Sequence, residues 1–294
     1  MGSSTISLGL GLGGGKSGTS SGRPSGGSYD NTLAASLDGT DDYVGIAGLA
    51  SRSLGALSMW VNITSANGIF SGGTDVDEMG MLAGFGPHTG GTGGYDGLNW
   101  GSFLTNTDLL TLRANSTVIA KYQVPSTGDK LAAGWHHIVL THNGTGYTFY
   151  IDGVIATSAP LSDGSTGGTI TTSTHPILTG SNFTSFGTPT IRIKIGGNKI
   201  NQYYSQGLWD EVALFDSALS ASQITTIYNS GVPGDISSLS PDGWWRMGDG
   251  TGDTNSSGGS PSNTDTIGTV ADQSGNSNNA SGINGPTYSS SVPT

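Results

Sequence analysis

The sequence predicts an all-β fold, a sandwich of two antiparallel sheets, and three observations carry the prediction. Trp135–His142 is rich in aromatic and β-branched residues, which favour a strand with one buried face. Tyr147, Phe149 and Ile151 follow at every second position, so these large side chains share one face of the next strand. Asp152–Gly153 is a residue pair typical of a two-residue hairpin turn. A meander with one apolar face needs a second sheet to cover that face.

The composition agrees with this fold class and excludes two classes of function. Glycine accounts for 51 of the 294 residues and charged residues for only 11%, a pattern of many turns and short strands. The formal net charge is −11 and no basic stripe is present, so we expect no nucleic-acid partner. No run of about 18 apolar residues occurs, so we expect no membrane insertion. Cysteine is absent, which leaves the redox compartment open.

The central stretch also resembles a known family. Trp-His-His-Ile-Val-Leu followed by Tyr-Thr-Phe-Tyr-Ile-Asp-Gly is similar to the signature of laminin-G-like, concanavalin A-like jelly-roll domains. Other segments resemble further strands of that family, in the family's order: Ser36–Val44, Leu57–Val61, Ile193–Gly197 and Gly207–Phe215. The resemblance covers residues 32–232 and implies a concanavalin A-like jelly roll. Because this fold carries lectins, enzymes, adhesion modules and virion parts, it implies no single function.

One helix is expected, at Ser220–Asn229. Ser220 and Gln223 match the capping box of a helix N-terminus, and apolar residues follow at helical spacing. Gly231 and Pro233 predict the end of the element. In the family that the sequence resembles, such a helix packs beside the last strand.

The domain division predicted from the sequence has three parts: an arm at 1–31, a jelly roll at 32–233 and a C-terminal extension at 234–294. Within the extension, Gly243–Asp249 and Val270–Asn276 resemble segments that precede the opening strand in the family. Here they follow the helix. The extension either begins a second, incomplete unit or pairs back onto the sandwich as added strands; we expect it to dock on the sandwich, because it carries a Trp-Trp pair.

Residues 1–31 are rich in glycine and serine and are predicted to form an extended N-terminal arm. Leu8, Leu10 and Leu12 alternate with glycine, so the leucines share one side of an extended chain. Such a strand suits addition to the surface of another subunit. A disordered tail is the alternative. Gly11–Ser17 resembles a phosphate-binding loop, but leucine replaces the first glycine and no strand–helix context surrounds it.

The catalytic residues expected of a glycoside hydrolase are missing from the sequence, so no enzyme activity is predicted. Such enzymes require two carboxylates across the scissile bond. The two glutamates of the chain, Glu78 and Glu211, lie in different segments. His136 and His142 fall on one face of their predicted strand and His137 on the other, an arrangement that packing explains without catalysis.

Calcium is the predicted cofactor, because the related domains often hold it near one rim. The ligands implied by that arrangement are Asp38, Asp41, Asp42 and Asp210; the alternative is that these aspartates cap turns.

Carbohydrate binding requires exposed aromatic side chains beside polar groups. The candidates in predicted loops are Tyr95, Trp100, Tyr203 and Tyr204.

Together these features predict a non-enzymatic virion structural protein of a tailed bacteriophage, either a capsid decoration protein or an appendage subunit. Met1–Gly15 lacks the basic region of a secretory signal, and virion proteins reach the outside of the cell by lysis. The pattern also resembles that of marine phage structural proteins. The expected partners are other virion proteins, copies of the same chain and a host-surface glycan. The alternative is a secreted bacterial carbohydrate-binding or adhesion module, and a glycan-active enzyme ranks third.

Overall fold

A computed structural model describes residues 29–47, 49, 55–63, 79–85, 98–103, 109–114, 117–123, 134–143, 146–156, 191–197 and 204–294. In several strands, among them all of those at 98–123, it describes the backbone alone. The chain divides into two compact units, Met1–Asp30 and Asn31–Thr294. Residues 1–28 of the predicted arm lie outside the described ranges.

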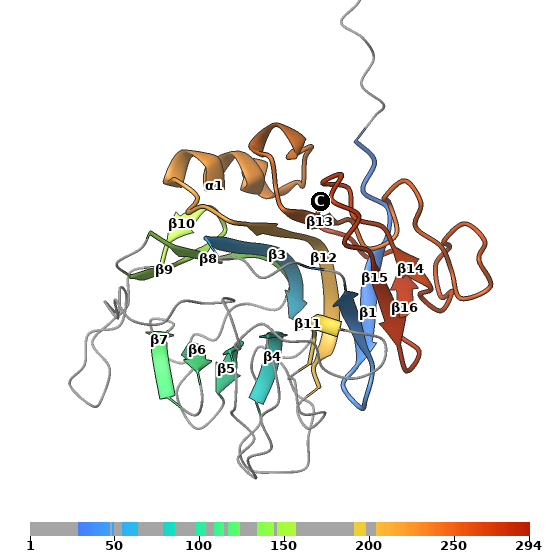
Figure 1. The fold of residues 1–294 in the computed structure, drawn as a ribbon, viewed down its shortest axis with the longest axis horizontal. Coiled ribbons are helices and arrows are strands. Elements are labelled where there is room, and N and C mark those ends of the chain that lie inside the picture. The colour runs from blue at the N-terminus through green and yellow to red at the C-terminus, as the bar shows by residue number, and fades with distance from the viewer. Residues whose placement is uncertain are drawn as a thin grey trace, which may run out of the picture. The chain divides into compact units, whose positions relative to one another are not determined.

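The second unit is the expected sandwich of two antiparallel sheets (Figure 1). Sheet A has the order β10-β9-β8-β3-β12-β1-β16, with β13 also paired to β12. Its strands are β1 (Ala34–Asp38), β3 (Ala56–Ile63), β8 (Gly134–His142), β9 (Tyr147–Ile151), β10 (Val154–Ile155), β12 (Gln206–Phe215), β13 (Gly243–Trp245) and β16 (Thr287–Ser289).

Sheet B has the order β14-β15-β2-β11-β4-β5-β6-β7. Its strands are β2 (Tyr43–Ala47), β4 (Met79–Phe85), β5 (Leu98–Phe103), β6 (Leu109–Ala114), β7 (Thr117–Gln123), β11 (Ile191–Ile195), β14 (Thr269–Val270) and β15 (Ala280–Ile283). The predicted meander is confirmed as β8, β9 and β10, and the Asp152–Gly153 turn has positive φ at both residues.

The predicted helix is confirmed as α1 (Ala221–Tyr228), with Ser220 as its N-cap and Gln223 completing the capping box. Asn229 ends it in the left-handed conformation. Two short 3-10 helices follow, η2 (Asn229–Gly231) and η3 (Ser237–Leu239). Figure 1 shows α1 on the side of sheet A that faces away from sheet B, where Tyr228 stacks on Trp60 of β3 with ring centroids 5.8 Å apart. The described residues include no helix long and apolar enough to cross a membrane.

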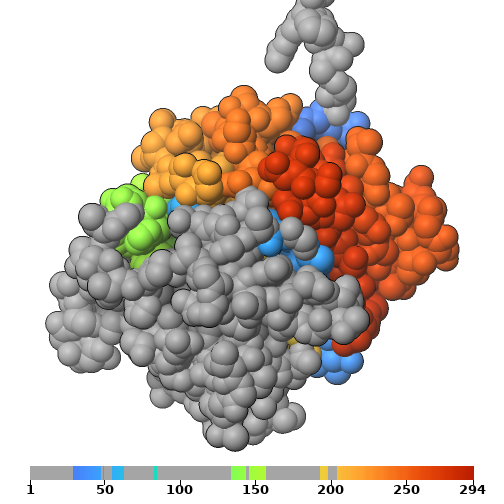
Figure 2. Space-filling view, in the orientation of Figure 1, coloured from blue at the N-terminus to red at the C-terminus, as the bar shows by residue number. Residues whose placement is uncertain are grey.

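The C-terminal extension belongs to the sandwich. β16 pairs with β1, β15 pairs with β2, and β13 pairs with β12, so residues after 242 supply strands to both sheets. The structure therefore places no domain boundary at 233/234, and of the two alternatives the pairing back onto the sandwich is the one observed. Figure 2 shows the red C-terminal segment as part of one continuous surface with the orange region around α1.

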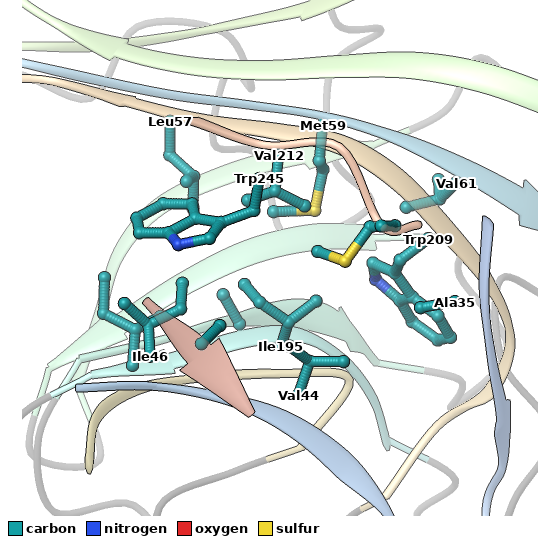
Figure 3. Close-up of a cluster of buried hydrophobic side chains, with 14 of the residues drawn as sticks. Ala35, Val44, Ile46, Leu57, Met59, Val61, Ile195, Trp209, Val212 and Trp245 are labelled. Carbon is teal, nitrogen blue, oxygen red and sulfur yellow. The ribbon is translucent and has the colours of Figure 1, made fainter. Parts of the chain in front are cut away.

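The core lies between the sheets and draws on both ends of the second unit. Figure 3 shows side chains of sheet A, including Met59 and Val212, pointing toward Val44 and Ile195 of sheet B. Trp245, from the C-terminal extension, is fully buried in the same cluster. Large aromatic side chains contribute most to such a core because each buries about 150–250 Å². The C-terminal extension is therefore part of the core as well as of the sheets.

Candidate functional site

The outer face of sheet B carries a group of aromatic and basic side chains that we call the tyrosine–lysine cluster: Tyr43, Lys194 and Tyr204. Side chains of a strand alternate between its faces. Ile193 and Ile195 point into the core, so Lys194 between them points outward. Lys194 pairs with Gly45 on one side and with Gly84 on the other, so neither neighbour places a side chain beside it.

The three side chains of the cluster are in contact. The rings of Tyr43 and Tyr204 stack with centroids 6.3 Å apart and planes inclined by 22°. The Lys194 Nζ atom lies 4.3 Å from the centroid of the Tyr43 ring, within cation–π range. Only 8% of Tyr43, 7% of Tyr204 and 2% of Lys194 is exposed. The cluster is therefore buried and does not present its rings to solvent. Its rim includes Asp41, whose carbonyl accepts a hydrogen bond from Asn284 Nδ2.

Burial sets the protonation of the cluster. It lowers the pKa of the Lys194 ammonium to about 8, so this group is mostly charged at neutral pH. Burial, with smaller contributions from the nearby Tyr43 and Asp41, raises the pKa of Tyr204 to about 12. Both tyrosines therefore keep their hydroxyl protons. At 2–8% exposure the three side chains are packed rather than open to a ligand, so the cluster can support a neighbouring binding surface but does not itself stack on a sugar ring.

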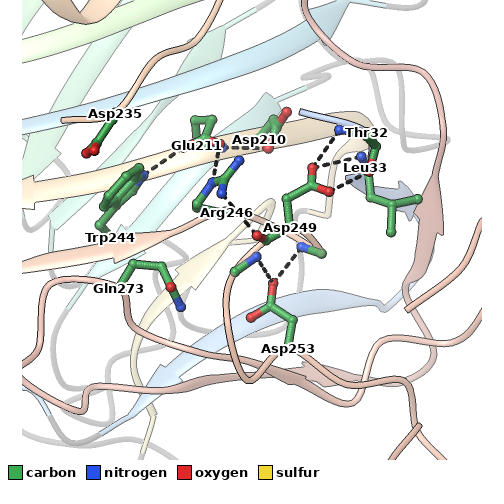
Figure 4. Close-up of polar contacts among 12 residues, drawn as sticks. Thr32, Leu33, Asp210, Glu211, Asp235, Trp244, Arg246, Asp249, Asp253 and Gln273 are labelled. Carbon is green, nitrogen blue, oxygen red and sulfur yellow. Dashed lines mark hydrogen bonds and ion pairs between the residues drawn. The ribbon is translucent and has the colours of Figure 1, made fainter. Parts of the chain in front are cut away.

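A second cluster lies at the point where β12 changes its neighbour (Figure 4). One edge of β12 pairs with β1 through Trp209 and then with β13 from Val212 onward. Between them the register of the β12–β3 pair shifts, and Glu211 adopts a φ of +46°. This β-bulge turns the Glu211 side chain toward the C-terminal extension. There its Oε2 accepts a hydrogen bond of 2.7 Å from Trp244 Nε1, and its Oε1 pairs with Arg246 Nε at 3.0 Å.

The same cluster holds the start of β1. Asp249 accepts hydrogen bonds from the backbone N–H groups of Thr32 and Leu33, and Arg246 Nη1 donates to the Asp249 carbonyl. Close by, Asp253 accepts bonds from three backbone N–H groups; burial raises its pKa to about 6, and those bonds act in the opposite direction. Side chains of the C-terminal extension thus hydrogen-bond to Thr32 and Leu33, which lie near the N-terminal end of the same unit.

Asp210 and Glu211 are adjacent carboxylates, but the structure does not arrange them for hydrolysis. Asp210 is fully buried, and burial, followed by the charge of Glu211, raises its pKa well above the usual range. Both oxygens of Glu211 already accept hydrogen bonds. A glycosidase needs two carboxyl groups that face a substrate from either side. This pair instead serves the internal network.

The structure separates the predicted calcium ligands. Asp42 accepts a hydrogen bond from the Asp38 backbone N–H, and Asp38 accepts one from that of Thr40, as turn caps do. Burial raises the pKa of Asp42 to about 7. Asp210 lies on β12, whereas Asp38, Asp41 and Asp42 lie at the turn from β1 to β2. No three metal-binding carboxylate or histidine side chains gather anywhere in the described ranges. Calcium binding stays a prediction.

The predicted glycan-binding residues are only partly described. Tyr95 and Tyr203 lie outside the described residues, and Trp100 is placed on β5 by its backbone alone. Tyr204 is buried against Tyr43 and does not present its ring to solvent. Tyr43 and Lys194 were not among the residues predicted for a glycan site. The alternation in Ile191–Ile195 was the available signal, because it places a lysine opposite two isoleucines.

His137 is buried beneath α1 and has an unusual electrostatic environment. Its Nε2 lies 2.8 Å from Ser58 Oγ, and its ring stacks on Tyr228. Its Nδ1 has no hydrogen-bond partner within the described structure. Burial lowers its pKa to about 3, with a small opposing contribution from Asp152. The histidine is therefore a neutral packing residue at neutral pH, as expected from the sequence.

We expect His137 to weaken the fold in acid. Because its folded pKa lies below the ordinary value of 6.5, protons bind the unfolded chain better, and stability falls as the pH drops below about 6.5. At about pH 4 the loss from this residue alone is on the order of 3 kcal/mol. Urea denaturation of wild type and His137→Gln at neutral and acid pH measures it. The variant should lose less free energy of unfolding on acidification; equal losses would contradict the prediction.

The fold is a concanavalin A-like jelly roll. A family profile described as concanavalin A-like lectin/glucanases superfamily matches residues 38–225, and the chain belongs to this superfamily. No curated protein sequence matches the chain.

Solved structures share the fold at low sequence identity. A candidate carbohydrate binding protein from Bacteroides ovatus is 13% identical with a TM-score of 0.52; the match covers 89% of this chain and 61% of that one. This chain therefore spans less than two thirds of that protein's length. Domain 4 of an extracellular arabinanase from Geobacillus stearothermophilus, in complex with arabinotriose, is 18% identical with a TM-score of 0.41, and covers 66% and 76% of the two chains. A CBM40 module of a Ruminococcus gnavus sialidase, bound to sialyllactose, is 13% identical with a TM-score of 0.39, and covers 60% and 84%.

Proposed function

We propose that the chain is a non-catalytic carbohydrate-binding module, with the buried tyrosine–lysine cluster supporting a sugar site on the outer face of sheet B. The observation that carries the proposal is the stacked Tyr43–Tyr204 pair with the Lys194 ammonium over one ring. Aromatic rings beside a few polar groups are the usual composition of ligand sites. The Bacteroides ovatus protein of similar fold, with its carbohydrate-binding description, adds support.

For the acidic pair that the structure describes on β12, the absence of catalysis in this proposal rests on the contacts of the second cluster. Glu211 is bonded to Trp244 and Arg246, and Asp210 is buried without access to solvent. Neither carboxylate can reach a glycosidic bond without dismantling the junction between β1, β12 and β13. A binding role needs no such rearrangement.

A glycan array of the full-length protein, followed by titration of the best ligand, tests the proposal. Lys194→Met keeps the apolar stem and removes the ammonium, so we expect affinity to fall by about tenfold or more. Lys121→Met removes the same charge from β7, at the edge of sheet B, and should leave affinity unchanged. An array with no bound glycan would reject the function. Full affinity in Lys194→Met would reject the site.

A virion role is the second candidate, and one observation favours it. Every described strand of both sheets lies within Asn31–Thr294, so none of these strands comes from the Leu/Gly arm. An arm of this kind is suited to anchoring a displayed module in a capsid or tail. Binding of a host-surface glycan by the sandwich fits the same placement. Mass spectrometry of purified phage particles tests it, because a virion subunit must be present in stoichiometric amounts.

A further inference from the structure

Within the described part of the chain, sheet A ends at an exposed apolar edge. The last strand, β10, pairs with β9 on one side only. Its two residues, Val154 and Ile155, are 67% and 47% exposed. Together with Val232, at 46%, they are the exposed large hydrophobic residues of the described ranges. Neither residue of β10 is a Lys, Glu or Pro, although natural edge strands commonly carry such residues.

The two faces of β10 differ. Val154 pairs with Ile151, whose side chain packs against the core, so Val154 extends the core face of the sheet. Ile155 pairs with Tyr150 on the opposite face. The Ala156 N–H donates to Phe149 O, so by the alternation of antiparallel ladders the N–H and C=O of Ile155 point away from β9. The edge thus offers backbone groups and an apolar surface on one face.

The Leu/Gly segment of the arm has the complementary pattern. As an extended strand it places Leu8, Leu10 and Leu12 on one face and glycines on the other. The net charge of the arm is also opposite in sign to that of the rest of the chain. Lys16 and Arg23 against Asp30 give residues 1–30 a net charge of +1, which leaves −12 on the rest of a chain with net charge −11.

We infer that the Leu/Gly segment of one copy adds as a strand to the β10 edge of a second copy. Its leucines then cover Val154 and continue the core face, and its glycines face outward. The arm leads into β1, which is next to the last strand at one end of sheet A, whereas β10 is the last strand at the other end. Its 28 residues before Tyr29 can span up to about 90 Å when extended. A partner molecule is therefore within reach, and the occupant is a second copy of this chain.

Sedimentation velocity of full-length variants tests the inference. We expect wild type to associate with rising concentration. Serine at Leu8, Leu10 and Leu12 together, or Val154→Lys alone, should weaken association by at least about tenfold. Val232→Lys adds the same charge at another exposed apolar residue and serves as the matched control. Association that is absent in wild type, or lost equally in Val232→Lys, would overturn the inference.

A mixing experiment separates exchange between copies from docking of the arm on its own chain. The triple-serine variant keeps an intact edge, and the Val154→Lys variant keeps an intact arm. If strands are exchanged, the two variants mixed together regain a dimer that neither forms alone. If the mixture stays monomeric while wild type associates, another surface mediates association and the inference is wrong.

Discussion

A chain that ends at Ser240 is expected not to fold, although the family match ends earlier, at residue 225. The truncation removes β13, β14, β15 and β16, which pair with strands in both sheets. It also removes buried core side chains: Trp245, Met247, Ile267, Val270, Ala280 and Tyr288. Each large side chain contributes about 1.5–3 kcal/mol, so their sum approaches or exceeds a typical net stability of about 5–15 kcal/mol.

The measurement is soluble yield together with the circular dichroism spectrum and thermal melt. Deletion of residues 1–28 is the matched control, because these residues belong to a separate unit. The control should keep a β-rich spectrum and a cooperative melt. A truncated chain that melts cooperatively near the wild-type temperature would show that the C-terminal strands are dispensable.

Arg246→Met is expected to destabilise the fold by about 3–5 kcal/mol, the usual cost of leaving one member of a buried ion pair without its partner. The change removes the Arg246 bonds to Glu211 and to the Asp249 carbonyl. Glu211, which is 5% exposed, would then lose its arginine partner and keep its hydrogen bond from Trp244. Chemical denaturation gives the free energy of unfolding.

The double variant Glu211→Met/Arg246→Met shows whether the loss comes from the unpaired charge. Because it removes both charges at once, it should recover a large part of the lost stability. If the double variant is no more stable than Arg246→Met, the arginine acts through its packing on Trp244, whose ring lies 5.9 Å from the guanidinium.

Local patterns were enough to predict much of the fold. The alternation at Tyr147–Ile151 and the Asp152–Gly153 pair predicted the meander, and Ser220 with Gln223 predicted the helix start; the structure confirms each. These signals depend on neighbouring residues, so one sequence contains them in full. The partner strands of the C-terminal extension were harder to predict, because Trp245 and Tyr288 meet partners on strands far away in the chain.

The candidate site was predicted less well, for a physical reason. Tyr204 was a candidate because it falls in a predicted loop, but its exposure depends on Tyr43, which is distant in sequence and stacks on it. Likewise, three of the aspartates proposed for calcium lie at one turn and the fourth, Asp210, lies on β12, which residue type alone does not reveal. Residue type can be read from the sequence, whereas convergence of side chains depends on tertiary pairing.

The pairing of β1 with β16 has a consequence for how the protein is made. Ala34 lies opposite Ser289, Asp249 holds Thr32 across 217 residues, and Asn284 bonds to Asp41 across 243. Contacts of such long sequence separation raise the contact order, and chains of high contact order fold slowly. On the ribosome, β1 cannot pair with β16 until nearly the whole chain has been translated. During that interval the nascent chain exposes an unpaired strand edge, and chaperones that shield such edges would determine its yield.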